Sequence, residues 1–345
     1  MIFPRRIFSD VPWLTPADLQ IFGTPSWALL DDVASTWLGH PCLALPSIRV
    51  GLCWALEQRG YSRHRDHILV PRFMGRCILN SLGRFALPVE SPTDQTRIAL
   101  VIDQFGHRQA TGSLSPQFAK RNWAYIEDSP YGVGVDERPG EGSLGRFIGL
   151  SKVLPAVQGA LFIAGDEALR QCIESNRQNS SAWGWPVWLT MLLLRKRYAT
   201  GYSDAADAAY ELYSAARGGS AALRGNLAAV FRRIELFERE SQERMAAVIH
   251  VLGKHVLPPD QCRLGYVVPF LPGTGLASAQ TIFRKCGFSD AVLHVDHNRN
   301  MLEPNYVKSL VIPMNPRIPR QSFDLLLSGL KALPVSMQTS AENRI

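Results

Sequence analysis

Short apolar runs rich in β-branched residues recur along the first half of the chain and have the pattern of buried strands. They are HILVPRF (67–73), RIALVIDQF (97–105), WAYIED (123–128), RFIGL (146–150) and GALFIAG (159–165). Segments with helical spacing, such as SLSPQFAKRN and GDEALRQCIES, lie between or after some of these runs. Near-continuous apolar strands with intervening helices predict an α/β fold built on a mostly parallel sheet that is covered on both faces.

The pattern changes beyond residue 200, where the chain becomes rich in alanine and leucine with helical spacing. DAADAAYELYSAAR is one such segment, and RGNLAAVFRRIELFERESQERMAAVIHVLGKH is a candidate for one long helix. From Leu257 onward, short segments punctuated by proline favour a smaller α+β unit. The sequence therefore predicts a large domain over residues 1–215, followed over 216–345 by the long helix and a small C-terminal domain.

The composition is that of an ordinary globular protein, with 345 residues, 46% hydrophobic and 19% charged. The formal net charge of +7 indicates anionic partners. Because the arginines are scattered singly or in pairs, this charge fits a small anionic ligand at least as well as nucleic acid, so we expect no nucleic-acid partner. The six cysteines form no CxxC pair, and we expect reduced thiols and no metal site. The run LHVDHNRN favours a polar loop over a metal site, because ligands drawn from one such run rarely converge.

The N-terminal segment MIFPRRIFSDVPW lacks the sustained apolar region of a signal peptide. The longest apolar run, around WGWPVWLTMLLL, is interrupted by Pro186 and is too short to span a bilayer. We therefore expect a cytoplasmic protein without a membrane partner. The three tryptophans of this run are expected to pack at a domain or subunit contact.

Two residues at the ends of predicted strands carry candidate chemistry, since ligands of open α/β sheets bind beyond the carboxyl ends of the strands. Asp128 ends one strand and Lys152 follows a later one, in a chain with seven lysines against thirty arginines. An amine that loses its charge on burial can form a Schiff base, and a carboxylate can hold a pyridinium nitrogen, as pyridoxal phosphate requires. Other interpretations stay open: Lys152 as a surface lysine past a strand, and Asp128 as the cap of an Asp-Ser-Pro turn.

The sequence segments around Asp128 and Lys152 are FAKRNWAYIEDSPYGVG, GSLGRFIGLSK and QGALFIAGDEAL. In this order they resemble the core of the DegT-type sugar aminotransferase family, within the fold type I pyridoxal phosphate enzymes. ALEQRGYSRHRDHILVPRF upstream and LAAVFRRIELFERESQERMAAV downstream extend the likeness from about residue 30 to about residue 335. The resemblance implies the fold type I PLP-transferase architecture, with a large domain built on a mostly parallel sheet and a smaller C-terminal α+β domain.

The resemblance also implies an activity. It is that of a pyridoxal-phosphate-dependent aminotransferase, which would aminate a keto sugar carried on a nucleotide, with glutamate as the amino donor. A homodimer is implied as well, because family members build each cofactor site from two chains. The alternative is a divergent, non-catalytic homologue with a binding or regulatory role.

Carried over residue by residue, the resemblance makes Lys152 the Schiff-base lysine and Asp128 the partner of the pyridine nitrogen. Tyr131 falls where the family has a glutamine near the phenolic oxygen of the cofactor. Ser47, Ile48 and Arg49 fall on the cup that binds the cofactor phosphate. The residues themselves support the cup, because the spacing after Ser47 predicts a helix that it would cap, and a helix N-terminus binds anions.

Several positions depart from the family pattern. Ile48 replaces a glycine of the phosphate cup, and Arg49 is a candidate to compensate by direct charge pairing. Arg224, whose equivalent reaches the cofactor phosphate of the partner subunit, lacks the asparagine that accompanies it in the family. Phe73 lies close to the position of the aromatic residue that stacks on the cofactor ring, and Arg72 and Arg76 are candidates to meet the phosphates of the acceptor.

Overall fold

The fold is that of a computed structural model. It describes residues 25–156, 158–178, 190, 221–257, 262–269, 273–286, 288, 292–316 and 318–333.

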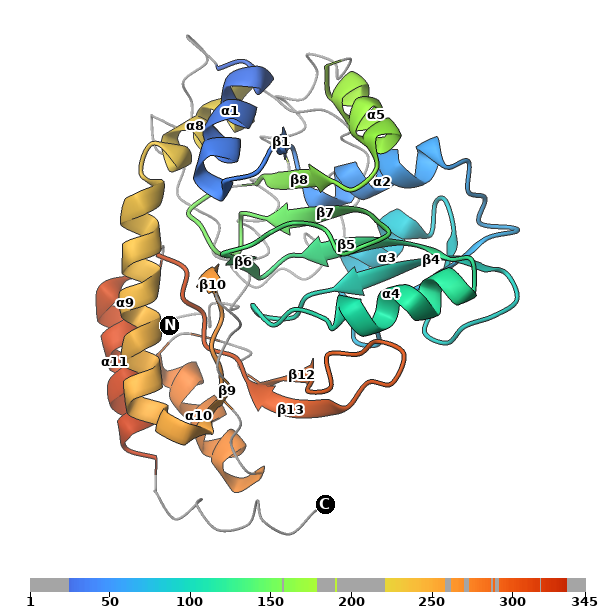
Figure 1. The fold of residues 1–345 in the computed structure, drawn as a ribbon. Helices are drawn as coiled ribbons and strands as arrows, with labels where there is room; N and C mark the ends of the chain where they lie inside the picture. The colour runs from blue at the N-terminus through green and yellow to red at the C-terminus, as the bar shows by residue number, and fades with distance from the viewer. Residues whose placement is uncertain are drawn as a thin grey trace.

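A seven-stranded sheet with the order β1-β8-β7-β5-β4-β2-β3 organises the first half of the chain (Figure 1). Its strands are β1 Leu43–Leu45, β2 His67–Leu69, β3 Leu87–Val89, β4 Thr96–Ile102, β5 Ala124–Ser129, β7 Ser143–Gly149 and β8 Ala160–Ala164. The neighbours from β3 to β7 pair in parallel, and β8 runs antiparallel to both β7 and β1. The mostly parallel sheet predicted from the five apolar runs is confirmed, because those runs supply β2, β4, β5, β7 and β8.

Helices cover both faces of this sheet, as Figure 1 shows. They are α1 Trp27–Leu38, α2 Ile48–Gln58, α3 Arg76–Leu82, α4 Thr111–Lys120 and α5 Glu167–Gln178. Alternating residues of β4 show why helices are needed on both faces of the sheet. Ile98 and Leu100 pack in the same apolar cluster as residues of α2 and α5, whereas Ala99 and Val101 pack with Leu114 and Phe118 of α4. Successive strand residues point to opposite faces, so a strand that is apolar throughout must be buried on both sides.

The candidate long helix is two helices, α8 Ala221–Phe231 and α9 Ile234–Leu252, so the prediction of one continuous helix is wrong. The chain turns at Arg232 and Arg233, where the Arg233 N–H bonds to the Val230 carbonyl three residues earlier. The bend lets α8 pack on α1, while α9 packs on the C-terminal helix α11 Arg320–Lys331 and on strand β10 Cys262–Gly265. Apolar packing in two directions outweighs the propensity of the continuous helical pattern.

Besides α9 and α11, the C-terminal part contains several further described elements. They are the 3₁₀ turn Gly253–His255, β9 Val256–Leu257, β10 Cys262–Gly265, β11 Val268–Pro269, α10 Gly273–Lys285, β12 Val292–Asp296 and β13 Tyr306–Leu310. β9 pairs with β11, β12 pairs with β13, and β10 pairs with β6 Gly132–Gly134, which follows β5. The β6–β10 ladder therefore ties the C-terminal part to the segment just beyond β5.

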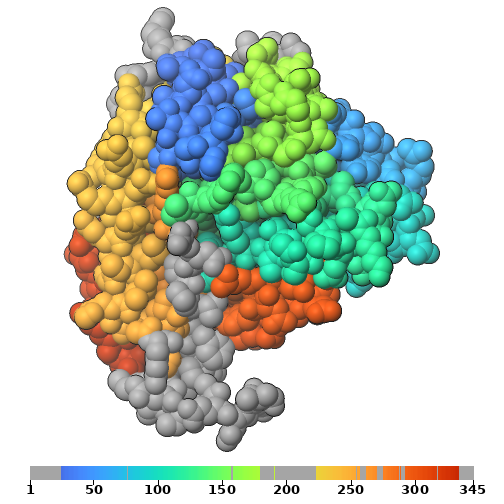
Figure 2. Space-filling view, viewed as in Figure 1, coloured from blue at the N-terminus to red at the C-terminus, as the bar shows by residue number. Residues whose placement is uncertain are grey.

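The surface view in Figure 2 shows the β12–β13 region directly beside α4, and Met301 of that region packs with Phe118 of α4. The proposed boundary at residues 215 and 216, the segment DAADAAYELYSAAR and the three tryptophans of WGWPVW lie outside the described residues. In the part of the chain that the structure describes, no helix combines the length and apolar character needed to cross a membrane.

Candidate functional site

Lys152 lies in a tight turn directly after β7. The Leu154 N–H donates to the Leu150 carbonyl at 2.8 Å, which closes the turn. The Lys152 carbonyl accepts hydrogen bonds from Tyr266 Oη at 3.2 Å and from Asn315 Nδ2 at 3.1 Å. Both donors belong to the C-terminal part, so this part of the chain holds the lysine-bearing turn in place.

The amine of Lys152 lies over an aromatic cluster formed by Tyr131, Phe105 and Tyr266. Its Nζ lies 3.7 Å from the centroid of the Tyr131 ring. Phe105 stacks on Tyr131 with ring centroids 4.6 Å apart, and Tyr266 meets the Tyr131 ring edge-on at 5.9 Å. A cation over an aromatic face is attracted by the ring quadrupole. The ring face of Tyr131 is therefore the part that meets Lys152; its predicted contact to the phenolic oxygen of the cofactor stays a prediction.

Phe105, a member of this aromatic cluster, has an unusual backbone conformation. It has φ 56°, and Gly106 after it has φ 84°. Gln104 and His107 exchange both backbone hydrogen bonds around them, at 3.0 and 2.9 Å. Two successive positive φ angles inside such a pair make a type I′ turn, in which a bulky first residue is uncommon. The turn follows β4 and directs the Phe105 ring onto Tyr131.

Asp128 lies near the end of β5 with 1% of its surface exposed. Burial raises the pKa of its carboxyl to about 7; the positive charge of Lys152 opposes this shift, and Asp103 adds to it. Its Oδ1 atom has no hydrogen-bond partner among the described residues. A buried carboxylate oxygen without a partner is unfavourable. A ligand that offers an N–H donor beside Lys152 would satisfy it.

The N-terminus of α2 lies close to the ends of β5 and β7. Ser47 caps this helix as predicted, with its Oγ accepting from the Val50 N–H at 3.3 Å. Ile48 is buried in the cluster that contains Phe147, and Gly149 makes room for it. A Cβ at position 149 would lie 3.1 Å from Ile48 Cδ1 and 3.1 Å from the backbone of Pro130. The structure therefore brings the predicted phosphate cup to the strand ends that carry the lysine and the aspartate.

Other candidates have different contacts. Arg224 lies on α8 with its Cζ 5.6 Å from the ring of Trp27 in the same chain. Arg72 is exposed, with Nε 3.8 Å from a carboxylate oxygen of Glu90. The side chain of Arg76 lies outside the described residues.

Phe73 packs on the C-terminal part. Its ring stacks on His294 with centroids 4.1 Å apart and meets Tyr306 edge-on at 5.2 Å. His297, from the same polar run as His294, has its Nε2 2.9 Å from Ser309 Oγ. These histidines thus take part in packing and hydrogen bonding, and no group of metal-ligating side chains occurs within the described ranges.

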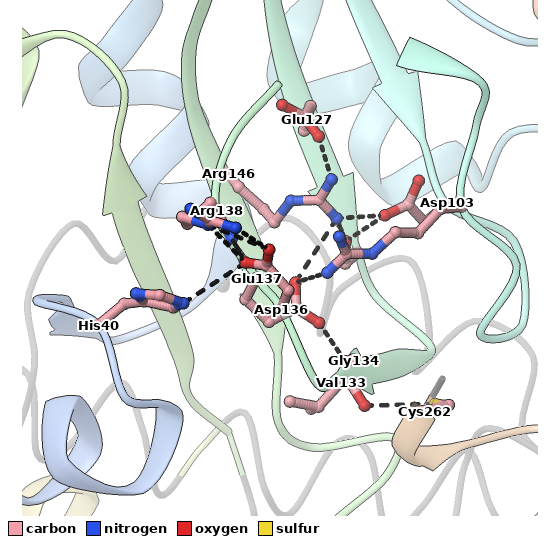
Figure 3. Close-up of polar contacts among 12 residues, drawn as sticks. His40, Asp103, Glu127, Val133, Gly134, Asp136, Glu137, Arg138, Arg146 and Cys262 are labelled. Carbon is pink, nitrogen blue, oxygen red and sulfur yellow. Dashed lines mark hydrogen bonds and ion pairs between the residues drawn. The ribbon is translucent and has the colours of Figure 1, made fainter. Parts of the chain in front are cut away.

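Sequence reasoning missed a buried ionic cluster beside Asp128. Arg146 of β7 has 2% of its surface exposed. Its Nη1 donates to Asp103 Oδ2 at 2.5 Å and to Ser129 Oγ at 2.9 Å, and its Nη2 donates to Glu127. Figure 3 shows the guanidinium between Glu127 and Asp103. A signal exists in the sequence, because the runs RIALVIDQF, WAYIED and RFIGL each contain a charged residue whose burial requires a partner.

The loop between β6 and β7 closes the cluster. Glu137 from this loop has Oε2 3.5 Å from Arg146 Nη1 and 3.0 Å from Arg108 Nη2. Glu127 Oε1 accepts from the Gly140 N–H at 2.7 Å. The buried cluster thus consists of Arg146, Asp103, Glu127, Ser129, Glu137 and Arg108.

Comparison with known proteins found no matching family model and no matching curated protein. Solved structures do match. DesI, solved in the presence of its TDP-sugar product, has a TM-score of 0.62 and 12% identity, covering 95% of this chain and 93% of its own. The PLP form of the putative sugar aminotransferase Spr1654 from Streptococcus pneumoniae has a TM-score of 0.60 and 11% identity, covering 96% and 98%. A DegT DnrJ EryC1 StrS aminotransferase from Brucella abortus has a TM-score of 0.56 and 12% identity, covering 91% and 92%.

These likenesses extend over nearly the whole chain, and the matching chains are covered to a similar extent. At such low identity they establish the fold. The architecture predicted from the resemblance, a mostly parallel sheet domain with a smaller C-terminal α+β part, is therefore confirmed.

Proposed function

We propose that this protein is a pyridoxal-phosphate-dependent aminotransferase of the DegT type. The observation that carries the proposal is that Lys152 and Asp128 lie at the carboxyl ends of the neighbouring strands β7 and β5, where Asp128 Oδ1 is buried without a hydrogen-bond partner among the described residues. In open α/β sheets this edge is the usual ligand site. Structural neighbours described as aminotransferases, one of them in its PLP form, support the choice of cofactor.

The residues at this edge fit the cofactor. When bound, pyridoxal phosphate supplies an electron sink for a carbanion on the substrate. Lys152 would hold the cofactor through its amine and, once released, would move a proton at the substrate carbon. Asp128 would accept the N–H of the ring nitrogen. Burial raises the pKa of the Asp128 carboxyl, and a cationic ring nitrogen would stabilise its ionised form.

The phosphate of the cofactor would bind at the N-terminus of α2. The backbone N–H groups and dipole at a helix start favour an anion. Ser47 keeps its hydroxyl proton for donation, because its oxygen accepts from the helix. The guanidinium of Arg49 would add a charge-assisted hydrogen bond, and Tyr131 would border the ring of the cofactor.

For the substrates, we infer a keto sugar carried on a nucleotide as acceptor and glutamate as donor. The TDP-sugar product of DesI supports this acceptor class. We place the enzyme in the cytoplasm as a homodimer, in which Arg224 would reach the cofactor phosphate of the partner subunit. Neither nucleic acid nor a membrane is a partner in this proposal.

The test is an absorption spectrum of the purified protein with pyridoxal phosphate, before and after glutamate. We expect a colour change on cofactor uptake and bleaching when the donor is added. Borohydride reduction followed by peptide mapping should place the label on Lys152. Lys152→Arg should abolish the label, because arginine stays protonated and cannot form an imine, whereas Lys120→Arg, at an exposed position on α4, should leave it unchanged.

A label on any lysine other than Lys152 would refute the assignment. Cofactor uptake without bleaching by any amino donor would favour the non-catalytic homologue, an alternative suggested by Ile48 in the phosphate cup.

A further inference from the structure

Arg146 holds the residues on both sides of Asp128. Its two terminal nitrogens donate to Glu127, which precedes Asp128, and to Ser129, which follows it. The first contact is ionic and the second is to a hydroxyl, and all three residues are buried. A planar guanidinium can make both contacts at once because its donors form a rigid fork.

The strand register explains why these contacts determine the direction of Asp128. Across β5 and β7, Glu127 lies opposite Arg146 and Asp128 lies opposite Phe147. Side chains alternate along a strand, so Glu127 and Ser129 point to one face and Asp128 to the other. Fixing the two flanking side chains therefore fixes the rotation of the strand about Asp128.

Asp103 extends this restraint to the neighbouring strand. Its Oδ2 accepts from Arg146 Nη1 at 2.5 Å and from Ser129 Oγ at 2.6 Å, and its backbone N–H donates to the Asp128 carbonyl at 2.9 Å. The Gln109 N–H holds the other carboxylate oxygen at 2.9 Å. The ends of β4 and β5 are thus tied to Arg146 in the middle of β7, and Figure 3 shows the charged members of this network.

We propose that Arg146 is a positioning residue for Asp128, which clamps the strand ends so that the Asp128 carboxyl is aimed at the ring nitrogen of the cofactor. The proposal rests on the proposed function, since it assigns a cofactor atom to Asp128. In this proposal Arg146 does not touch the cofactor and acts on it only through Asp128.

The variant that tests the clamp is Arg146→Lys. A lysine keeps the positive charge among the carboxylates but carries it as a point charge, so it cannot reach Glu127 and Ser129 together. The chain offers a matched control in Arg177, which is equally buried at 2% exposed. Arg177 binds both carboxylate oxygens of Asp31 at 2.7 and 2.8 Å and the Ala44 carbonyl at 2.9 Å, and so ties α1 to β1. Arg177→Lys therefore removes a comparable clamp away from Asp128.

The measurement is equilibrium affinity for two probes, pyridoxal phosphate and its 1-deaza analogue, in which carbon replaces the ring nitrogen. The parent should prefer the natural cofactor, because only that ring can pair with Asp128. Arg146→Lys should reduce this preference by about tenfold, the size of a coupling between residues in one network. Arg177→Lys should leave the preference at the parental value even if both affinities fall.

Equal weakening of both probes by Arg146→Lys, with the preference intact, would overturn the proposal and leave Arg146 a purely structural residue. Ser129→Ala, which removes one tie without unpairing a charge, is the milder second variant and should reduce the preference in the same direction. If Arg146→Lys fails to fold and Ser129→Ala leaves the preference unchanged, the proposal that Arg146 positions Asp128 is refuted.

A parent that binds neither probe would refute the proposed function, and the clamp would then be decided on the cofactor-free protein. Amide hydrogen exchange in Arg146→Lys should rise over residues 124–129 relative to the parent, and Arg177→Lys should not change it there. Unchanged exchange over 124–129 in Arg146→Lys would contradict the clamp irrespective of the cofactor.

Discussion

At the scale of single residues, burial of the Asp128 carboxyl is unfavourable for the stability of the folded chain. A carboxyl buried in the sheet with one oxygen lacking a described partner raises the free energy of the folded state when it ionises. Positions of this kind occur at functional sites, where the ligand later supplies the missing interaction.

Asp128→Asn should therefore stabilise the cofactor-free protein above neutral pH. The folded-state pKa is about 7 against a usual value of 3.8, with burial as the main cause. Below pH 4 both states hold the proton and the group has no effect. Between about pH 4 and pH 7 the unfolded chain ionises while the folded chain does not, so the free energy of unfolding falls as pH rises. At pH 8 we expect Asp128→Asn to be more stable than the parent by up to about 4 kcal/mol.

Urea unfolding of both proteins at pH 4 and pH 8, without cofactor, checks this. The stability difference should appear only at the higher pH. An equal difference at both pH values would show that ionisation of Asp128 is not its cause.

At the scale of elements, the start of α2 has a structural role as a capped helix end and, in the proposed function, would also bind the cofactor phosphate. Ser47→Ala removes the cap of the helix and should lower the free energy of unfolding by about 1 kcal/mol. It should also weaken pyridoxal phosphate binding, because the same hydroxyl faces the proposed phosphate site. Ser26→Ala is the matched control, since Ser26 caps α1 through the Leu29 N–H at 3.1 Å.

Denaturant unfolding and cofactor titration of the two variants separate these roles. Both should lose helix capping, whereas only Ser47→Ala should lose cofactor affinity. If the two variants bind the cofactor equally well, the phosphate is bound at another element.

At the scale of the whole molecule, the C-terminal part supports the turn that carries Lys152. Tyr266→Phe removes the hydroxyl that donates to the Lys152 carbonyl at 3.2 Å and keeps the ring against Phe105 and Tyr131. We expect a loss of about 1 kcal/mol in the free energy of unfolding, the usual net value of one hydrogen bond. Borohydride labelling of Lys152 should slow as well, because the turn is less restrained. A labelling rate equal to that of the parent would show that the Tyr266 hydrogen bond does not restrain the turn.

The homodimer is the second prediction at this scale. Light scattering should give a mass twice that of one chain, and Arg224→Ala should weaken cofactor binding if Arg224 completes the site of the partner subunit. In the structure Arg224 packs over Trp27 of its own chain, so Trp27→Leu is the control for lost packing. A monomer that binds one cofactor per chain would contradict the shared site.

The linear pattern was enough to predict the strands around the site and the order of the elements. β4, β5, β7 and β8 are largely buried and each contains a run of consecutive apolar residues, so they are recognisable without knowledge of their neighbours. Lys152 and Asp128 were proposed as site residues by the same reasoning, because parallel strands place their carboxyl ends at one edge. The cap at Ser47 is equally local, since it depends on residues within one turn of helix.

Tertiary structure alone decided the rest. Arg146 of β7 contacts β5 and the residue directly after β4, up to 43 positions away, and nothing local says which carboxylates meet the guanidinium. The break between α8 and α9 arises because the two halves pack on different partners, although the helical pattern runs through it. Tyr266 and Asn315 reach the Lys152 turn from more than 100 residues away. Local chemistry therefore determined the strands and the positions of Lys152 and Asp128, whereas contacts distant in sequence determined how these two residues are held.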